Sequence, residues 1–221
     1  MRIGLFGGTF DPIHFGHLRA ALEVRQGFDL DEIFMIPAAA PPHKKTAAVT
    51  NASDRLKMLE LAVSGQSGIK ISDIELRRPG PSYTIDTIGY FKKTRSPDSK
   101  IYLILGLDAF LEIDTWKSYL NLLEQVAFIV ISRPILDCND FSSRWNVLKQ
   151  FLCDKISSDY KFSDSLLCFN HPKARPIHMF DVTSLDISGT RIREHVRKGL
   201  SIEFLVPPKV EKYIKTRGLY L

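Results

Sequence analysis

Residues 7–17 read Gly7-Gly8-Thr9-Phe10-Asp11-Pro12-Ile13-His14-Phe15-Gly16-His17. They join the first apolar run, Ile3–Phe6, to the first helical pattern, His14–Arg25. A strand, a glycine-containing turn and a helix form the opening unit of an open α/β sheet, and ligands bind such sheets at the carboxyl ends of the strands. This stretch therefore predicts both the fold class and the position of the functional site.

The rest of the chain continues the alternation of strands and helices. Apolar runs without polar alternation predict parallel strands covered on both faces, namely Glu32–Ile36, Ile69–Ser72, Ile101–Leu105, Val126–Ile131 and Ile177–Phe180. Amphipathic stretches predict helices, namely Ser53–Val63 with Ser53 as its N-cap, Thr84–Lys93, Ser188–Lys198 ended by Gly199, and Lys209–Thr216 ended by Gly218. The order predicts an α/β fold with a doubly wound parallel sheet and C-terminal helices.

One segment interrupts this rhythm. Residues 134–176 are rich in polar residues and hold all three cysteines, with Trp145–Leu152 as a candidate short helix. We expect a single domain over residues 1–221 with an insertion at about 134–176. The cysteines have no CxxC spacing, so they predict neither a disulfide framework nor a zinc site, and a reducing cytoplasm fits best.

Composition and charge narrow the class of protein. With 44% apolar and 25% charged residues, the chain is typical of a globular protein, not a disordered one. The longest apolar run, Val126–Ile131, is too short for a bilayer, and the N-terminal apolar stretch is too short for a signal peptide. We expect a cytoplasmic protein without a membrane partner.

The net charge of +5 at first suggests a nucleic-acid partner. Residues 191–221 hold eight basic and three acidic side chains, which accounts for the whole excess. The charge is thus a local feature of the C-terminal segment, and we expect no nucleic-acid partner.

The side chains of residues 7–17 suit a phosphate group. The two opening glycines leave backbone N–H groups open to an anion, and Thr9 adds a hydroxyl. His14 and His17 project to one side near the positive helix end, and Gly16 between them leaves room for the anion. The alternative is a tight turn with surface or zinc-binding histidines, although the sequence shows no third ligand. No dinucleotide fingerprint or P-loop ending is present.

Thr9 with His14-Phe15-Gly16-His17 resembles the T/HxGH signature of the nucleotidylyltransferase superfamily, whose fold is Rossmann-like. The longer string from Gly7 to His14 resembles the bacterial nicotinate-nucleotide adenylyltransferases in particular. Asp186-Ile187-Ser188-Gly189-Thr190-Arg191-Ile192-Arg193 resembles the ISxTxIR motif with which the superfamily binds ATP. From composition alone this second segment is a capped, solvated basic helix. Gly189 stands where many members carry a hydroxyl residue, and we expect Arg191 to face solvent.

Three further segments resemble the acceptor side of the same family. They are Pro41-Pro42-His43-Lys44, Pro81-Ser82-Tyr83-Thr84 and Gly106-Leu107-Asp108 with Thr115-Trp116 soon after. The N–H groups that open the Thr84 helix can hold a carboxylate, while helix capping by Ser82 or Thr84 is the plainer interpretation. Asp108 suits a ribose hydroxyl or an ordered water. Trp116 suits stacking on a pyridine ring, against core packing as the alternative.

The resemblance implies a role for each matching residue. It implies a catalytic role for His14, His17 and Arg193. It implies ATP binding by Gly7, Gly8, Thr9, Phe10, Gly16, Ile187, Ser188 and Thr190. It implies nicotinate-nucleotide binding by His43, Lys44, Tyr83, Thr84, Asp108, Trp116 and Arg133.

The implied reaction transfers AMP from ATP to nicotinate mononucleotide, which gives deamido-NAD and pyrophosphate. Mg²⁺ is expected to bind mainly through ATP, without a protein metal site. The alternatives are a sister enzyme that uses nicotinamide mononucleotide or phosphopantetheine, a fragment of a class I aminoacyl-tRNA synthetase, and a non-enzymatic nucleic-acid-binding protein. The acceptor-side segments argue against phosphopantetheine, and the length argues against the synthetase. The sequence leaves open whether copies form a homo-oligomer.

Overall fold

The computed structural model describes residues 1–39, 49–132 and 141–221. The strands of this described part are β1 Arg2–Gly8, β2 Glu32–Pro37, β3 Ile69–Ile71, β4 Lys100–Gly106, β5 Ala127–Ser132, β6 Lys161–Ser163, β7 Cys168–Asn170 and β8 Ile177–Asp181. The helices are α1 Phe15–Gly27, α2 Ala52–Val63, α3 Ile74–Arg77, α4 Thr84–Thr94, α5 Leu107–Phe110, α6 Tyr119–Gln125, α7 Phe141–Phe151, α8 Gly189–Arg197 and α9 Pro208–Arg217. Short turns of 3-10 and π helix lie at Ile113–Thr115 and Leu152–Ile156.

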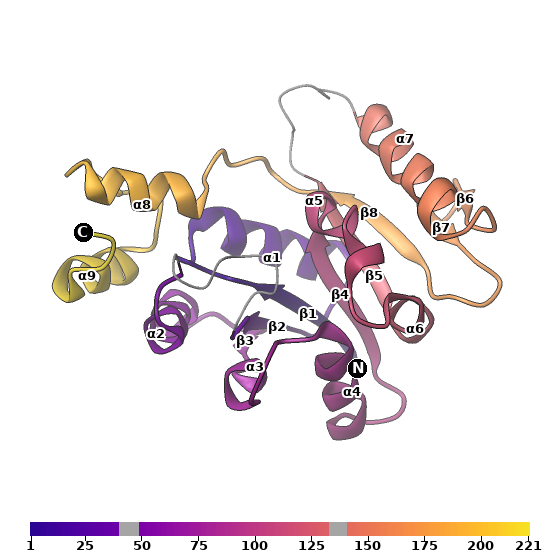
Figure 1. Cartoon of the computed structure of the whole chain (residues 1–221), viewed down its shortest axis with the longest axis horizontal. Coiled ribbons are helices and arrows are strands. Elements are labelled where there is room, and N and C mark those ends of the chain that lie inside the picture. The colour runs from indigo at the N-terminus through magenta and orange to yellow at the C-terminus, as the bar shows by residue number, and fades with distance from the viewer. Residues whose placement is uncertain (40–48, 133–140) are drawn as a thin grey trace.

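The strands form one sheet in the order β3-β2-β1-β4-β5-β8-β7-β6. From β3 to β8 every neighbouring pair is parallel. At the far edge, β7 pairs antiparallel with β8, and β6 pairs antiparallel with β7. The strand order reverses between β1 and β4, and their carboxyl ends meet there (Figure 1). The predicted doubly wound α/β fold is confirmed, and this reversal is where such sheets bind ligands.

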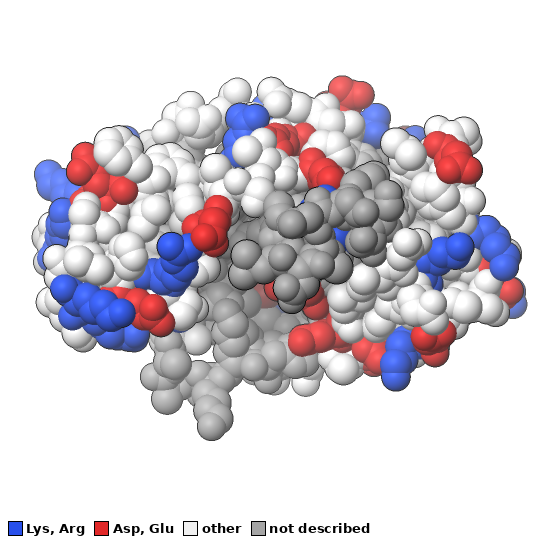
Figure 2. Space-filling model, turned by 90° about the horizontal axis from the view of Figure 1, so that it is seen from above, with Lys and Arg blue, Asp and Glu red and all other residues white. Residues whose placement is uncertain are grey.

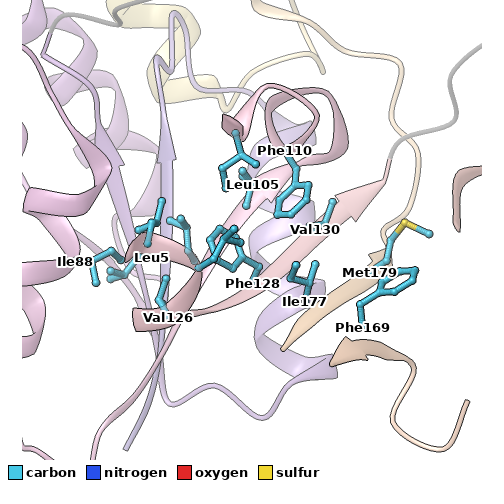
Figure 3. Packing of buried hydrophobic residues seen from close by; sticks show 14 of the residues in the cluster. Leu5, Ile88, Leu105, Phe110, Val126, Phe128, Val130, Phe169, Ile177 and Met179 are labelled. Atoms are coloured by element: carbon cyan, nitrogen blue, oxygen red, sulfur yellow. The ribbon is translucent and has the colours of Figure 1, made fainter. Parts of the chain in front are cut away.

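The sheet separates two hydrophobic cores. Leu5, Phe128 and Val130 point into the first core, which is covered by α4, α5, α6 and α7 (Figure 3). Their sequence neighbours Phe6 and Ile129 point into the second core, covered by α1, α2, α8 and α9. Strands buried on both faces need apolar residues at every position, and this explains why their sequences lack polar alternation. Each fully buried side chain contributes about 1.5–3 kcal/mol to folding.

Predicted and observed elements differ mainly at their ends. All six predicted strands and all five predicted helices are present, and each of their ends lies within two residues of its expected position. The N-cap of α2 is Asn51 and not Ser53, because the Asn51 side chain accepts the Ser53 N–H at 3.0 Å. Gly218 ends α9 in the left-handed conformation, as glycine after a helix commonly does.

The chain between β5 and β8 is the region expected to be an insertion. In its described part, α7 is longer than the predicted Trp145–Leu152 helix, and β7 extends the sheet from β8. The side chain of Trp145 packs on Phe162 and Phe169, with ring centroids 4.8 and 5.4 Å away. This unit lies at the opposite end of the sheet from α9 (Figure 1). In the described ranges, no helix combines the length and apolar character needed to cross a membrane.

Candidate active site

Two neighbouring cavities open at the reversal of strand order. The larger has a volume of about 800 Å³ and lies between the β1–α1 loop and the start of α8. The smaller has a volume of about 310 Å³ and lies beside the start of α4. Both are lined by the same residues at the ends of β1 and β4, which are Gly7, Gly8, Thr9, Gly106 and Ala109. Ligands in the two cavities would therefore meet over the glycine pair.

His14 and His17 lie side by side at the wall of the larger cavity. Their rings stack with centroids 3.7 Å apart and planes 28° from parallel. His14 is the N-cap residue of α1 and is 1% exposed, so the pair spans the boundary of the helix and not its first full turn. Stacking holds both imidazoles on one side of the helix, as the spacing predicts. Each ring can present an N–H to an anion in the cavity.

The residues around the histidines orient the two rings. Phe10 has a positive φ of 50°, a left-handed conformation that aromatic residues seldom adopt. Its buried ring meets His17 edge-on at 5.0 Å. A Cβ at Gly8 would lie 2.9 Å from the Phe10 ring, and a Cβ at Gly16 would lie 3.1 Å from the His14 ring. Two glycines of the motif thus accommodate aromatic rings of this chain.

The expectation that Gly16 leaves room for an anion needs correction. Gly16 does not line the larger cavity, and the space above it holds the ring of His14. The first N–H of α1, that of Phe15, donates to the Leu205 carbonyl at 3.1 Å. The side chains of this segment therefore face the cavity more directly than its helix N-terminus does.

The start of α8 forms the opposite wall. Ser188 caps the helix by accepting the Arg191 N–H at 3.2 Å, and Thr190 lines the cavity. Arg193 donates from Nη1 to the Asp11 carbonyl at 2.6 Å and from Nη2 to Thr190 Oγ1 at 3.2 Å. These bonds tie the two motifs together and leave further guanidinium N–H groups for a ligand.

The structure explains why position 189 is a glycine here and not the hydroxyl residue of many family members. A Cβ at this position would lie 2.7 Å from the Asp11 carbonyl oxygen, which is backbone and cannot turn aside. The close approach of α8 to the β1–α1 loop thus requires a residue without a side chain. It also allows the bond from Arg193 to the same carbonyl.

We expect Gly189→Ala to lower the free energy of unfolding by about 1–3 kcal/mol, because the methyl group would push the two motifs apart. Gly7→Ala is the matched control for stability, since a Cβ there meets nothing within 4 Å. Urea unfolding of both variants would measure the difference. Equal stability of the two would contradict the steric argument.

Two further residues of the α8 motif, Ile187 and Arg191, line neither cavity. Ile187 packs against the second core and is absent from the lining of either cavity. Arg191 is exposed and pairs with Asp186, as expected for the variable position. The side chain of Ile187 therefore supports the motif from the core side, and ATP binding at this residue stays a prediction.

The smaller cavity collects the predicted acceptor-side residues. Tyr83, Thr84 and Trp116 all line it. The ring of Trp116 also packs against the first core, so its two interpretations coexist. The N-cap of α4 is Tyr83 and has no side-chain cap bond, and Ser82 Oγ instead accepts the Ala39 N–H at 3.0 Å. Capping by Ser82 or Thr84 is therefore wrong.

Two charged residues that were not predicted as site residues line the smaller cavity, Lys117 and Glu75. The Lys117 ammonium lies 4.2 Å from the centre of the Tyr83 ring, a cation–π contact. Glu75 is buried and accepts Thr87 Oγ1 at 2.8 Å, and Thr87 in turn accepts an Arg78 N–H at 2.6 Å. Burial raises the pKa of Glu75, while Thr87, Ser82 and Arg78 oppose the shift. The one sequence feature that could have indicated a role for Lys117 is its position directly after Trp116.

Asp108 belongs to the larger cavity. It lies in the first turn of α5, after β4 ends at Gly106, and it lines the larger cavity but not the smaller. A Cβ at Gly106 would lie 2.3 Å from an Asp108 carboxylate oxygen, so this glycine makes room for the carboxylate. Asp108 therefore lies in the cavity of the phosphate-binding motifs and not on the expected acceptor side.

The remaining predicted contacts lie outside the described residues, namely His43, Lys44 and Arg133. Within the described part of the chain, no group of three or more His, Cys, Asp or Glu side chains could hold a metal ion. In the larger cavity, the described acidic side chains are Asp11 and Asp108. Asp11 already accepts hydrogen bonds from Tyr220 and the Thr50 N–H, so Asp108 is the carboxylate that a cation could approach.

Comparison with known proteins identifies the family of this chain. The cytidylyltransferase-like family model matches residues 5–195. A probable nicotinate-nucleotide adenylyltransferase of Desulfatibacillum aliphaticivorans is 45% identical over 227 residues and covers 100% of both chains. One of Pelobacter propionicus is 40% identical over 220 residues and covers 100% of this chain and 98% of its own.

Solved structures give the same architecture. The nicotinic acid mononucleotide adenylyltransferase of Plasmodium falciparum, solved in complex with NaAD, aligns with a TM-score of 0.70. The alignment covers 99% of this chain and 97% of that one, at 21% identity. At this identity the likeness demonstrates the shared fold.

Proposed function

Because this chain belongs to the cytidylyltransferase-like family and, within it, to the nicotinate-nucleotide adenylyltransferases, we propose that it transfers AMP from ATP to nicotinate mononucleotide. The products are nicotinate adenine dinucleotide and pyrophosphate. The observation that carries the proposal is the pair of neighbouring cavities that are both lined by Gly7-Gly8-Thr9. The two phosphate-binding motifs line the larger cavity, and Tyr83 and Trp116 line the smaller one. The reacting phosphates of two nucleotides would therefore meet between the cavities.

The reaction needs no nucleophile from the protein. An oxygen of the acceptor 5′-phosphate attacks the α-phosphorus of ATP in line, a new phosphorus–oxygen bond forms, and the bond to the β-phosphate oxygen breaks. Pyrophosphate leaves with the electron pair of that bond. The protein contributes by positioning the two substrates and by stabilising negative charge in the transition state.

The described residues divide these tasks between the cavities. His14, His17 and Arg193 would stabilise charge on the ATP phosphates, while Ser188 and Thr190 hold the start of α8 against them. In the smaller cavity, Trp116 and Tyr83 would contact the pyridine ring. The free N–H groups at the start of α4 and the Lys117 ammonium would favour a carboxylate on that ring.

Nucleotidyltransferases of this family typically need a divalent metal ion. We propose Mg²⁺, which would bind mainly to ATP oxygens, with Asp108 as the nearest carboxylate of the larger cavity. When bound, the ion would supply positive charge to the phosphates.

We also propose a cytoplasmic location and no nucleic-acid partner. Cys153 and Cys168 are free thiols, as a reducing compartment allows. Basic and acidic side chains are interspersed over the face shown in Figure 2, and this arrangement favours a small anion over a polyanion.

An assay of pyrophosphate release with ATP, Mg²⁺ and one acceptor at a time tests the activity. The acceptors are nicotinate mononucleotide, nicotinamide mononucleotide and phosphopantetheine. We expect release to be at least about tenfold faster with the nicotinate nucleotide, since its carboxylate matches donors that an amide would leave unpaired. Release with phosphopantetheine, or with neither pyridine nucleotide, would contradict the assignment.

A further inference from the structure

The next-to-last residue of the chain reaches the active-site loop. The hydroxyl of Tyr220 donates to Asp11 Oδ1 at 2.7 Å, across 209 positions of sequence. Tyr220 has a φ of 70° and lies in the turn that follows α9. Burial and the charge of Asp11 raise the pKa of Tyr220, so its phenol remains a hydrogen-bond donor.

Asp11 is the residue that this contact restrains. Its side chain is 4% exposed, and its second carboxylate oxygen accepts the Thr50 N–H at 3.2 Å. Arg193 Nη1 lies 3.9 Å from that oxygen, although it donates to the Asp11 backbone carbonyl at 2.6 Å. The carboxylate and the guanidinium therefore form only a long ion pair, and the guanidinium donates its hydrogen bond to the backbone carbonyl of Asp11 and not to the carboxylate.

We infer that Tyr220 is a positioning residue for nucleotide transfer, because its hydroxyl holds the Asp11 carboxylate away from Arg193 and so leaves the guanidinium for ATP phosphates. A buried carboxylate that loses one of its two donors turns to the nearest cation. Here that cation is Arg193, which lines the larger cavity. This inference rests on the proposed function, since it assigns Arg193 to ATP.

The chain offers a matched control for the test. Tyr213 Oη donates to Asp54 Oδ1, also at 2.7 Å, and joins α9 to α2. Neither Tyr213 nor Asp54 lines either cavity. Tyr220→Phe and Tyr213→Phe thus remove the same kind of hydrogen bond, once beside the site and once away from it.

We expect Tyr220→Phe to raise KM for ATP by about tenfold, because Arg193 would lose one charge-assisted contact with the ATP phosphates. KM for nicotinate mononucleotide should stay within about twofold of the wild-type value. Tyr213→Phe should leave both KM values within about twofold. Partial unfolding lowers kcat without separating the two KM values, so this difference distinguishes positioning from a structural role. Equal KM values for ATP in the two variants would overturn the inference.

The double variant Asp11→Asn with Tyr220→Phe gives a second measurement. Asparagine carries no charge to capture Arg193, so KM for ATP should fall back below that of Tyr220→Phe alone. If the hydrogen bond mattered only for folding, the double variant would bind ATP no better than the single one, and the inference would be wrong. A wild-type protein that released no pyrophosphate would instead contradict the proposed function.

Discussion

Replacing His17 by Ala is expected to lower kcat by roughly 10²–10³, the usual effect of removing one donor aimed at charge in a transition state. His17 stacks on His14 with 3.7 Å between ring centroids and faces the larger cavity. Developing charge on the ATP phosphates would then lose an N–H donor that needs no reorganisation during the reaction. KM for ATP should change less than kcat, because the contact strengthens mainly in the transition state.

His195→Ala is the matched control for this prediction. His195 lies on α8, where its Nδ1 pairs with the Ser201 carbonyl at 3.2 Å, and it lines neither cavity. Steady-state pyrophosphate release should be within about twofold of the wild type in this control. Thermal unfolding of His17→Ala must show a folded protein, since its ring also packs on Phe10. A folded His17→Ala protein with near-normal kcat would refute the catalytic role.

The sequence was sufficient to predict the sheet and the two phosphate motifs. Strands such as Val126–Ile131 are recognisable because burial on both faces leaves a continuous apolar run. The motifs at residues 7–17 and 186–193 are recognisable because each follows a strand or opens a helix. The structure brings them to one cavity, where Arg193 joins the Asp11 carbonyl.

Close contacts between distant segments could not be predicted in the same way. Gly16 reads as space for an anion and Gly189 as the absence of a hydroxyl side chain, yet the first accommodates the His14 ring and the second the Asp11 carbonyl. Ser82 reads as a helix cap, yet it accepts the N–H of Ala39 on another loop. A local sequence pattern shows which residue types are present. Which distant group each of them contacts is determined by the fold.

Buried polar residues are the hardest to interpret from sequence, and Arg55 is the clearest example. Within α2 it reads as an ordinary exposed helix residue, yet it is 1% exposed. Its guanidinium donates to the carbonyls of Thr50 at 3.0 Å, Thr9 at 2.8 Å and Ala39 at 3.4 Å. Burial lowers the pKa of Arg55, and the charge of Asp11 opposes that shift. One side chain thus joins the loops after β1 and β2.

Arg55→Leu is accordingly expected to lower the free energy of unfolding by about 3–5 kcal/mol, because it leaves the buried carbonyls without a donor and removes one of the two cations near Asp11. Arg55→Lys should recover only part of the loss, since an ammonium cannot reproduce the planar fork. Arg77→Leu is the control. Arg77 is exposed and pairs with Asp73 four residues before it, an interaction worth about 0.5 kcal/mol at most.

Urea unfolding of the three variants, followed at equilibrium, measures these differences. Arg55→Leu within about 1 kcal/mol of Arg77→Leu would show that water or rearranged loops replace the guanidinium. The loss should also extend to activity below the unfolding transition, because the Thr9 carbonyl that Arg55 holds belongs to the loop shared by both cavities. A destabilised Arg55→Leu protein with normal kcat while folded would confine Arg55 to stability. Reduced kcat in the folded protein would place it among the residues that hold the active-site loop in position.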